Sequence, residues 1–358
     1  MQTSFDSPPL PSRLEINLPQ IQANFDQMRS FAKPGTKALA VIKANAYGHG
    51  AVEIAHYLKH VDYFAVATVS EAIELRNSGI TKPILVLTAV LNSTVNFYKL
   101  YNLTAVISDL EHFDLLEDGT KAHLQFDTGM YRFGILPERL SEVKEKISST
   151  RVNINGIMTH FAKSGDPGDA AVKQQLDMFN SLRSHFPKEW ITHVANTGGI
   201  AFYPESHFDM IRVGVSLYGY GAGDTQISGI KPVCSWKTEI IQVKPIKKGT
   251  GIGYNWTYIA PNDGFVHVIP IGYADGYVRG LGNKISVKIG EDFVPVVGRI
   301  TMDYSLLFSE KKYPTGTEVE ILGNGPHSAD SWAKELNTIP YEILTRMGER
   351  RVKRVYLR

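Results

Sequence analysis

The chain has 358 residues, 43% of them hydrophobic and 21% charged, so it can form one large domain or two smaller ones with a substantial core. Its formal net charge of +2 gives no reason to expect a nucleic acid or an acidic membrane as a partner. The single cysteine, Cys234, excludes a framework of internal disulfides and suits a reducing compartment. Because no segment approaches the roughly 20 apolar residues of a membrane span, we expect a soluble, cytoplasmic protein.

The first two thirds of the chain alternate short apolar runs with amphipathic stretches. Residues 1–12 are predicted to be a flexible lead, followed by a short strand at 15–18 and a helix over 18–31. The apolar runs then occupy residues 37–43, 63–69, 83–88, 105–108, 122–127, 154–160, 191–196 and 210–217. About eight strand-then-helix units match the number and length of a (β/α)₈ barrel, so residues 13–230 are predicted to form this α/β fold.

The pattern changes after residue 221. Residues 221–229 are typical of a linker, and the rest shows strand alternation interrupted by frequent turns. Residues 231–358 are therefore predicted to form a mostly β C-terminal domain.

The first barrel strand leads directly to Lys43. In a barrel of parallel strands the carboxyl ends of the strands meet at the active-site face, so this lysine is predicted to point into a pocket. A lysine whose pKa is lowered there can form a Schiff base with a carbonyl group. This stretch alone does not distinguish such a residue from an ordinary surface lysine at a strand end.

Other polar residues follow the later strands in the same way. They are Tyr47 after the first strand, residues 127–132 after the fifth, His160 at the sixth, His193 and 196–199 at the seventh, and Arg212 within the eighth. Such groups are costly on buried strands, so their position at one edge predicts a shared polar site. The glycine-rich loop 196–199 suits a phosphate. Together these residues favour a phosphorylated carbonyl cofactor held on a lysine, with pyridoxal phosphate as the leading candidate.

Eight motifs, in order and on both predicted domains, resemble those of the bacterial alanine racemases. They are AVIKANAYGHG (40–50), DTGMYRFG (127–134), MTHFA (158–162), HVANTGG (193–199), IRVGVSLYG (211–219), GTGIGYNWTY (249–258), PIGYADGY (270–277) and GRITMD (298–303). The resemblance covers essentially the whole chain. It implies an isomerase that interconverts L-alanine and D-alanine on pyridoxal 5'-phosphate and supplies D-alanine, for example for cell-wall synthesis.

The resemblance also implies roles for individual residues. Lys43 would hold the cofactor and act as the base for the D-isomer, while Tyr254 would serve the L-isomer from the opposite face. A racemase needs proton-transfer groups on both faces of Cα. In the family this tyrosine reaches the barrel of the partner subunit, which implies a homodimer with shared active sites. The remaining implied contacts are Tyr47, His160, Thr197, Arg212, Gly214 and Val215 for the cofactor, Arg132 and Met302 for the substrate, and Gln125, His193, Asp303 and Tyr273 as supporting residues.

Some positions depart from the family pattern. Gln125 stands where many relatives have a lysine that becomes carbamylated, and its carbonyl is expected to accept a hydrogen bond from Arg132. Thr197 replaces the commoner serine and Thr301 replaces a common cysteine. The other histidines, His123 among them, are interpreted as structural, and no metal site is expected. Alternatives are a broader-specificity or serine racemase, another pyridoxal-phosphate barrel enzyme such as a decarboxylase or aldolase, and a cofactor carrier without turnover.

Overall fold

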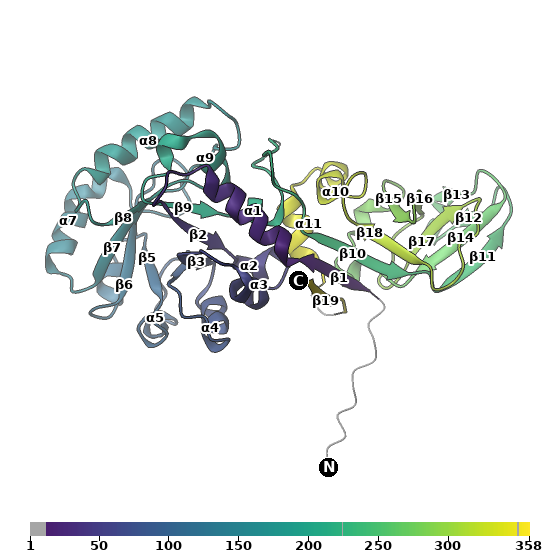
Figure 1. The fold of residues 1–358 in the computed structure, drawn as a ribbon, viewed down its shortest axis with the longest axis horizontal. Helices are drawn as coiled ribbons and strands as arrows, with labels where there is room; N and C mark the ends of the chain where they lie inside the picture. Colours follow the sequence, from purple (N-terminus) through teal and green to yellow (C-terminus); the bar gives the residue numbers. More distant parts are fainter. Residues whose placement is uncertain (1–11, 224, 349–350) are drawn as a thin grey trace, which may run out of the picture. The chain divides into compact units, whose positions relative to one another are not determined.

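The computed structural model describes residues 12–223, 225–348 and 351–358. Residues 19–231 form one compact unit, and the described residues up to 18 and from 232 onward form the other (Figure 1). Residues 1–11 of the predicted flexible lead lie outside the described residues. In the described part of the chain, every helix is too short or too polar to cross a bilayer.

The first unit contains the predicted barrel, which is confirmed. Eight parallel strands are found among the described residues, in the spatial order β8-β7-β6-β5-β4-β3-β2-β9. They are β2 (Lys37–Val41), β3 (Tyr63–Val66), β4 (Ile84–Val86), β5 (Thr104–Ile107), β6 (Lys121–Gln125), β7 (Asn153–Met158), β8 (Ile191–His193) and β9 (Met210–Val213). The two ends of this order meet where Arg212 N donates to Ala195 O at 3.0 Å and Asp209 N donates to Thr192 O at 3.1 Å, which closes the barrel.

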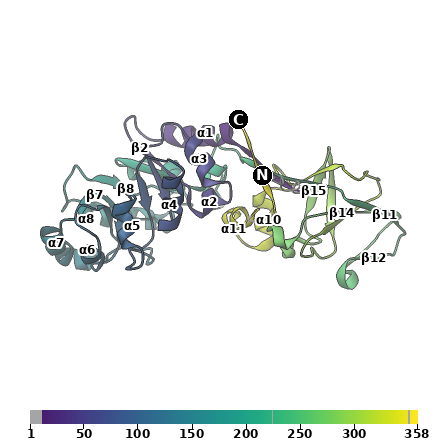
Figure 2. The same ribbon diagram turned by 90° about the horizontal axis from the view of Figure 1, so that it is seen from below.

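Helices surround these strands (Figure 1, Figure 2). They are α1 (Leu18–Ser30), α2 (Lys43–Tyr47), α3 (Ala51–Tyr57), α4 (Val69–Asn77), α5 (Val95–Leu100), α6 (His112–Leu115), α7 (Leu140–Ser149), α8 (Ala170–Arg183) and α9 (Thr197–Phe202), with 3₁₀ turns η1 (Pro137–Arg139), η2 (Pro204–Ser206) and η3 (Val215–Tyr218). Local sequence sets their beginnings. Thr68 and Glu71 form a capping box at α4, and Asp169 accepts from Ala171 N at α8.

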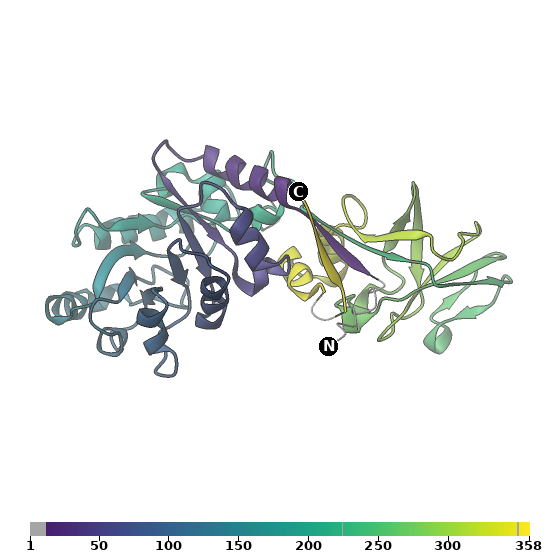
Figure 3. The same ribbon diagram turned by 60° about the horizontal axis from the view of Figure 1, so that its bottom comes forward.

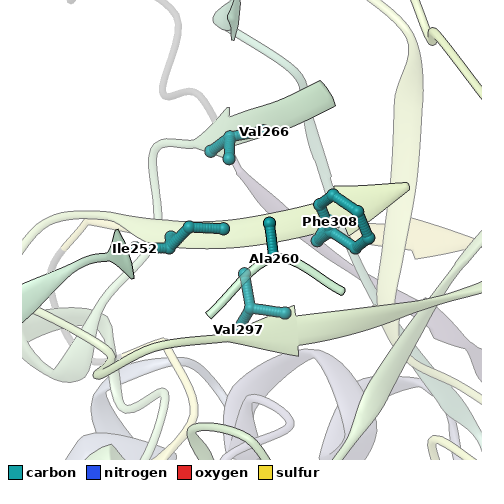
Figure 4. Packing of buried hydrophobic residues seen from close by; sticks show 5 residues of the cluster. All are labelled: Ile252, Ala260, Val266, Val297 and Phe308. Carbon is teal, nitrogen blue, oxygen red and sulfur yellow. The ribbon is translucent and has the colours of Figure 1, made fainter. Parts of the chain in front are cut away.

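The second unit is the predicted mostly β domain. Its main sheet has nine strands among the described residues, in the order β11-β14-β17-β16-β15-β18-β10-β1-β19. They are β1 (Arg13–Asn17), β10 (Cys234–Glu239), β11 (Gln242–Ile246), β14 (Gly264–Ile269), β15 (Ser286–Ile289), β16 (Asp292–Val297), β17 (Ser305–Ser309), β18 (Glu318–Leu322) and β19 (Lys353–Leu357). The unit also holds the hairpin β12 (Gly251–Ile252) and β13 (Tyr258–Ile259), 3₁₀ turns η4 (Tyr254–Trp256), η5 (Tyr273–Asp275) and η6 (Arg279–Leu281), and helices α10 (Ala329–Leu336) and α11 (Pro340–Arg346). Ile252, Ala260, Val266, Val297 and Phe308 pack together in one part of its core (Figure 4).

The first strand belongs to this β unit and not to the barrel, where residues 13–18 were expected. Strand β1 pairs antiparallel with β10 and parallel with β19 (Figure 3). Leu14 and Ile16 lie on one face of the strand and are buried. Arg13 and Glu15 lie on the other face, where Arg13 Nε donates to Glu15 Oε1 at 2.8 Å. This two-residue period matches an antiparallel sheet with one solvated face, and it differs from the continuous apolar runs of the barrel strands.

Candidate functional site

Lys43 lies at the end of the first barrel strand, followed by a strained turn. Residues 44–47 all have left-handed backbone angles, with φ between 50° and 52°. Each such residue costs about 1–2 kcal/mol relative to the right-handed form, so the turn needs support. Asn45 Oδ1 accepts from Ala51 N at 2.8 Å, and Glu71 Oε1 accepts from Ala44 N at 2.5 Å. Strain of this kind concentrates at functional sites, and here it fixes the direction of the backbone directly after the lysine.

The surroundings of Lys43 favour its neutral amine. Burial lowers the pKa of Lys43, and the nearby cation Arg132 lowers it further, while Glu71 acts in the opposite direction. A neutral amine is the nucleophilic form that attacks carbonyl groups.

Arg212 on β9 is buried in a set of fixed acceptors. Its Nη1 donates to His193 O at 2.9 Å and to His193 Nδ1 at 3.0 Å. Its Nη2 donates to the Thr159 and Val194 carbonyls at 3.0 and 2.8 Å, and to His160 Nδ1 at 3.1 Å. Burial lowers the pKa of Arg212 to about 9, so it is still a cation at neutral pH. None of these hydrogen bonds uses the N–H on its Nε.

The surroundings of the two histidines that receive these bonds favour the neutral imidazole. Burial is the main cause that lowers the pKa of both His160 and His193 well below the usual value, and the Arg212 cation acts in the same direction. Each ring therefore accepts from Arg212 through an unprotonated Nδ1.

Hydroxyl groups converge beside Gly214. A methyl group added at Gly214 would come within 3.5 Å of Thr197 Oγ1 and 3.8 Å of Tyr47 Oη. Thr197 Oγ1 also lies 3.2 Å from Ser216 Oγ in η3, which begins at the buried Val215. Strand β9 pairs with β2 up to Ala40↔Val213, so this group of hydroxyls lies beside the segment that carries Lys43.

The loop that follows β6 carries Arg132 on its exposed side. It is closed at its base, where Asp127 N donates to Ile135 O at 3.0 Å and Ile135 N donates to Gln125 O at 2.9 Å. The expected bond from Arg132 to the Gln125 side chain is not formed. Instead, Gln125 Nε2 donates to Phe133 O at 3.0 Å, because the closed loop brings this backbone carbonyl over the side chain. Gln125 therefore acts on Arg132 only through the backbone of the loop.

The β unit carries the other predicted site residues on exposed loops. Tyr254 begins η4 with 69% of its surface exposed, and Met302 is 53% exposed. Tyr273 N donates to Thr301 O at 3.0 Å, which links the two loops. Asp303 accepts from Arg351 Nη1 at 2.6 Å, and Arg351 also forms a bidentate pair with the buried Asp275 at 2.8 and 3.0 Å.

The structure thus divides the predicted residues between the two units. The strand ends of the barrel carry Lys43, Tyr47, Gln125, Arg132, His160, His193, Thr197, Arg212, Gly214 and Val215, and the β unit carries Tyr254, Tyr273, Met302 and Asp303. One contact was not predicted: Nδ1 of His123, a residue interpreted as structural, lies 2.7 Å from His193 Nε2. No residue pattern indicates this contact, which joins two separate strands, β6 and β8.

Comparisons with known proteins agree on one family. The model "Alanine racemase, N-terminal domain" matches residues 16–222, and "Alanine racemase, C-terminal domain" matches residues 233–356. Alanine racemase 2 of Caldanaerobacter subterraneus is 35% identical over 97% of this chain and 95% of its own length. The alanine racemase of Lactobacillus acidophilus is 33% identical over 97% of both chains.

Solved structures show the same similarity. An alanine racemase of Clostridium difficile has a TM-score of 0.92 at 32% identity, over 98% of this chain and 97% of the other. The alanine racemase of Bartonella henselae, described with covalently bound pyridoxal phosphate, has a TM-score of 0.88 at 28% identity, over 98% of this chain and 100% of the other.

Proposed function

Because the chain belongs to the alanine racemase family, we propose that it is a pyridoxal-phosphate-dependent racemase that interconverts L-alanine and D-alanine. One observation carries the proposal beyond the family name. A lysine with a lowered pKa lies at the barrel's strand ends together with two cations, Arg132 and Arg212, and beside a group of hydroxyls. This is the arrangement that a carbonyl cofactor with a phosphate group needs.

The residues present fit this cofactor at three points. Lys43 would take its aldehyde. Tyr47, Thr197 and the backbone at Gly214 and Val215 would hold its phosphate, since two hydroxyl oxygens already face one spot beside Gly214. Arg212 would face its ring nitrogen through the unused Nε–H, flanked by His160. When bound, the cofactor supplies an electron-withdrawing ring that makes the Cα–H of an attached amino acid acidic.

Arg212 sets the limits of that chemistry. A guanidinium has only hydrogen-bond donors, so it can donate to an unprotonated ring nitrogen. Unlike a carboxylate, it cannot accept a hydrogen bond from a protonated one, and so it does not favour protonation of the ring. Five fixed acceptors on two neighbouring segments, 159–160 and 193–194, hold it in one orientation. Arg132, at the substrate side, would bind the amino-acid carboxylate as an exposed cation.

Lys43 and Tyr254 would move the protons, one on each face of Cα. The tyrosine is well exposed on its own unit, where its side chain can enter a second protein surface. We propose that two copies associate so that Tyr254 of one copy, with Met302 beside it, completes the barrel site of the other. Asp303 and Tyr273 would support these loops through Arg351 and Thr301.

Chiral chromatography tests the substrate. Purified protein is incubated with pyridoxal phosphate and, separately, with L-alanine, L-serine and a basic L-amino acid. Fastest conversion of alanine is expected. Faster conversion of a larger amino acid would support racemase activity but show that alanine is not the preferred substrate. If none of the three amino acids is converted, the proposed activity is wrong.

Mixing two inactive variants tests the shared site. Lys43→Ala and Tyr254→Phe are each expected to lose most activity, while Tyr101→Phe on the side of the barrel is expected to keep it. After unfolding and refolding together, half of the dimers are mixed, and each has one intact site, so activity returns to about a quarter of wild type. If Tyr254 acted within its own chain, the mixture would contain no intact site and would stay inactive.

A further inference from the structure

A row of hydrogen bonds runs from the candidate site into the centre of the barrel. Arg212 Nη1 contacts His193 Nδ1 at 3.0 Å, and His193 Nε2 contacts His123 Nδ1 at 2.7 Å. Both histidines are fully buried. The row therefore joins β9, β8 and β6 through side chains alone.

The chemistry of the donors fixes the direction of every bond. Arg212 can only donate, so His193 Nδ1 must be the acceptor. A neutral His193 then carries its proton on Nε2 and donates to His123 Nδ1. His123 in turn must carry its proton on Nε2, and this buried nitrogen has no hydrogen-bond partner in the described chain. Burial lowers the pKa of His123 to about 3, with Arg212 adding to the effect, so His123 stays neutral.

The backbone is shaped to place this ring. The register of β6 against β7 shifts between Ala122 and His123: Ala122 pairs with Ile154 and His123 with Gly156, so the extra residue is Asn155 on β7. The ring lies against Gly156, where a methyl group would come within 2.4 to 2.6 Å of its Cδ2, Cγ and Nε2. Only a glycine leaves room for the imidazole there. An ordinary apolar side chain would fill the same space without an orphaned N–H, so packing alone does not explain a histidine.

We propose that His123 is a positioning residue: its Nδ1 accepts from His193 Nε2, fixes the tautomer of His193, and so keeps His193 Nδ1 free of a proton and able to hold Arg212. This role rests on the proposed function for its catalytic consequence. Without the acceptor, His193 can carry its proton on Nδ1, where it would face the Nη1 donor of Arg212. The guanidinium would then lose one of the five acceptors that orient it, and with it the alignment of Nε toward the cofactor.

Two substitutions of nearly equal shape separate this role from packing. In His123→Asn the side-chain oxygen can replace Nδ1 as an acceptor, whereas His123→Leu removes the acceptor. The holoenzyme is labelled with ¹⁵N-histidine, and the signals of His193 are identified by their loss in His193→Gln. In wild type and in His123→Asn, His193 is expected to be protonated on Nε2 only at neutral pH. In His123→Leu this pattern is expected to change.

Kinetics give a second readout. His123→Leu is expected to lower kcat roughly tenfold with little change in KM, and His123→Asn is expected to restore most of it. Gly156→Ala, which displaces the ring without removing it, should resemble His123→Leu. The proposal is overturned if wild-type His193 carries its proton on Nδ1, or if the Asn and Leu variants give the same His193 signals and the same kcat. The tautomer is measured without any turnover, so the result stands even if the protein racemises nothing.

Discussion

Replacing Gln125 with leucine tests how the Arg132 loop is held. The substitution removes the 3.0 Å bond from Gln125 Nε2 to Phe133 O and keeps a similar side-chain volume at a buried position. Phe133 is 38% exposed, so water can replace the lost donor. The free energy lost is then the net contribution of one neutral hydrogen bond, about 0.5–1.5 kcal/mol.

This magnitude distinguishes two ways of orienting Arg132. If the substitution weakens substrate binding by about 0.5–1.5 kcal/mol through the loop, KM for alanine rises about 2-fold to about 13-fold and kcat stays unchanged. A direct bond between Gln125 and the Arg132 guanidinium would be charge-assisted and worth about 1.5–3 kcal/mol, which corresponds to roughly 13-fold to 160-fold.

Steady-state racemisation in both directions provides the assay. Gln27→Leu is the matched control, since Gln27 Nε2 also donates to a backbone carbonyl, that of Ser228, at 3.4 Å. The control should leave both constants unchanged. A KM for Gln125→Leu equal to that of wild type would refute the orienting role, and a rise far above tenfold would refute the backbone route in favour of direct contact.

Three further predictions concern charge, cofactor and thiol. Arg132→Gln should raise the pKa of Lys43, because Arg132 is, after burial, the main cause that lowers this pKa. Uptake of pyridoxal phosphate by the apoprotein should then shift to higher pH, and an unshifted pH profile would contradict the prediction. Thr197→Val should weaken the binding of pyridoxal phosphate about tenfold, as measured by absorbance titration. Substitution of another buried threonine, Thr104→Val, is the control and should leave this binding unchanged. Burial raises the pKa of Cys234 to about 12, so iodoacetamide should label it only after unfolding, and rapid labelling of folded protein would exclude the burial.

The sequence predicted the barrel and the position of its site because both follow from short-range patterns. Apolar runs at regular spacing define the strands, and polar residues directly after them define the site face. The strands β8 and β9 end earlier than their apolar runs, at His193 and Val213. The residues after these points leave the barrel to form α9 and η3, which carry Thr197 and Val215, so the shortening itself builds the site.

Contacts that depend on backbone irregularities could not be predicted. The loop closure between Asp127 and Ile135 brings a carbonyl to Gln125, which converts an expected acceptor into a donor. The register shift that sets His123 opposite Gly156, and the missing side chain of that glycine, leave room for the imidazole that contacts His193. The assignment of β1 to the β unit likewise depends on pairing with β10 and β19, which lie far along the chain.

The electrostatics of the barrel site explain why these positioning contacts matter. Lys43, Arg132 and Arg212 all act on one another or on His160, and Glu71 is the one anion among the charged groups that shift these pKa values in the described chain. The two arginine cations repel each other and disfavour a charged Lys43 beside them, so each arginine must be held in place by other means. Arg212 is held by carbonyls and neutral imidazoles, and Arg132 by the backbone of its loop. A phosphate and a substrate carboxylate would offset this charge, which is why neutral supports, and not acidic partners, suit a site that has to keep its affinity for anions.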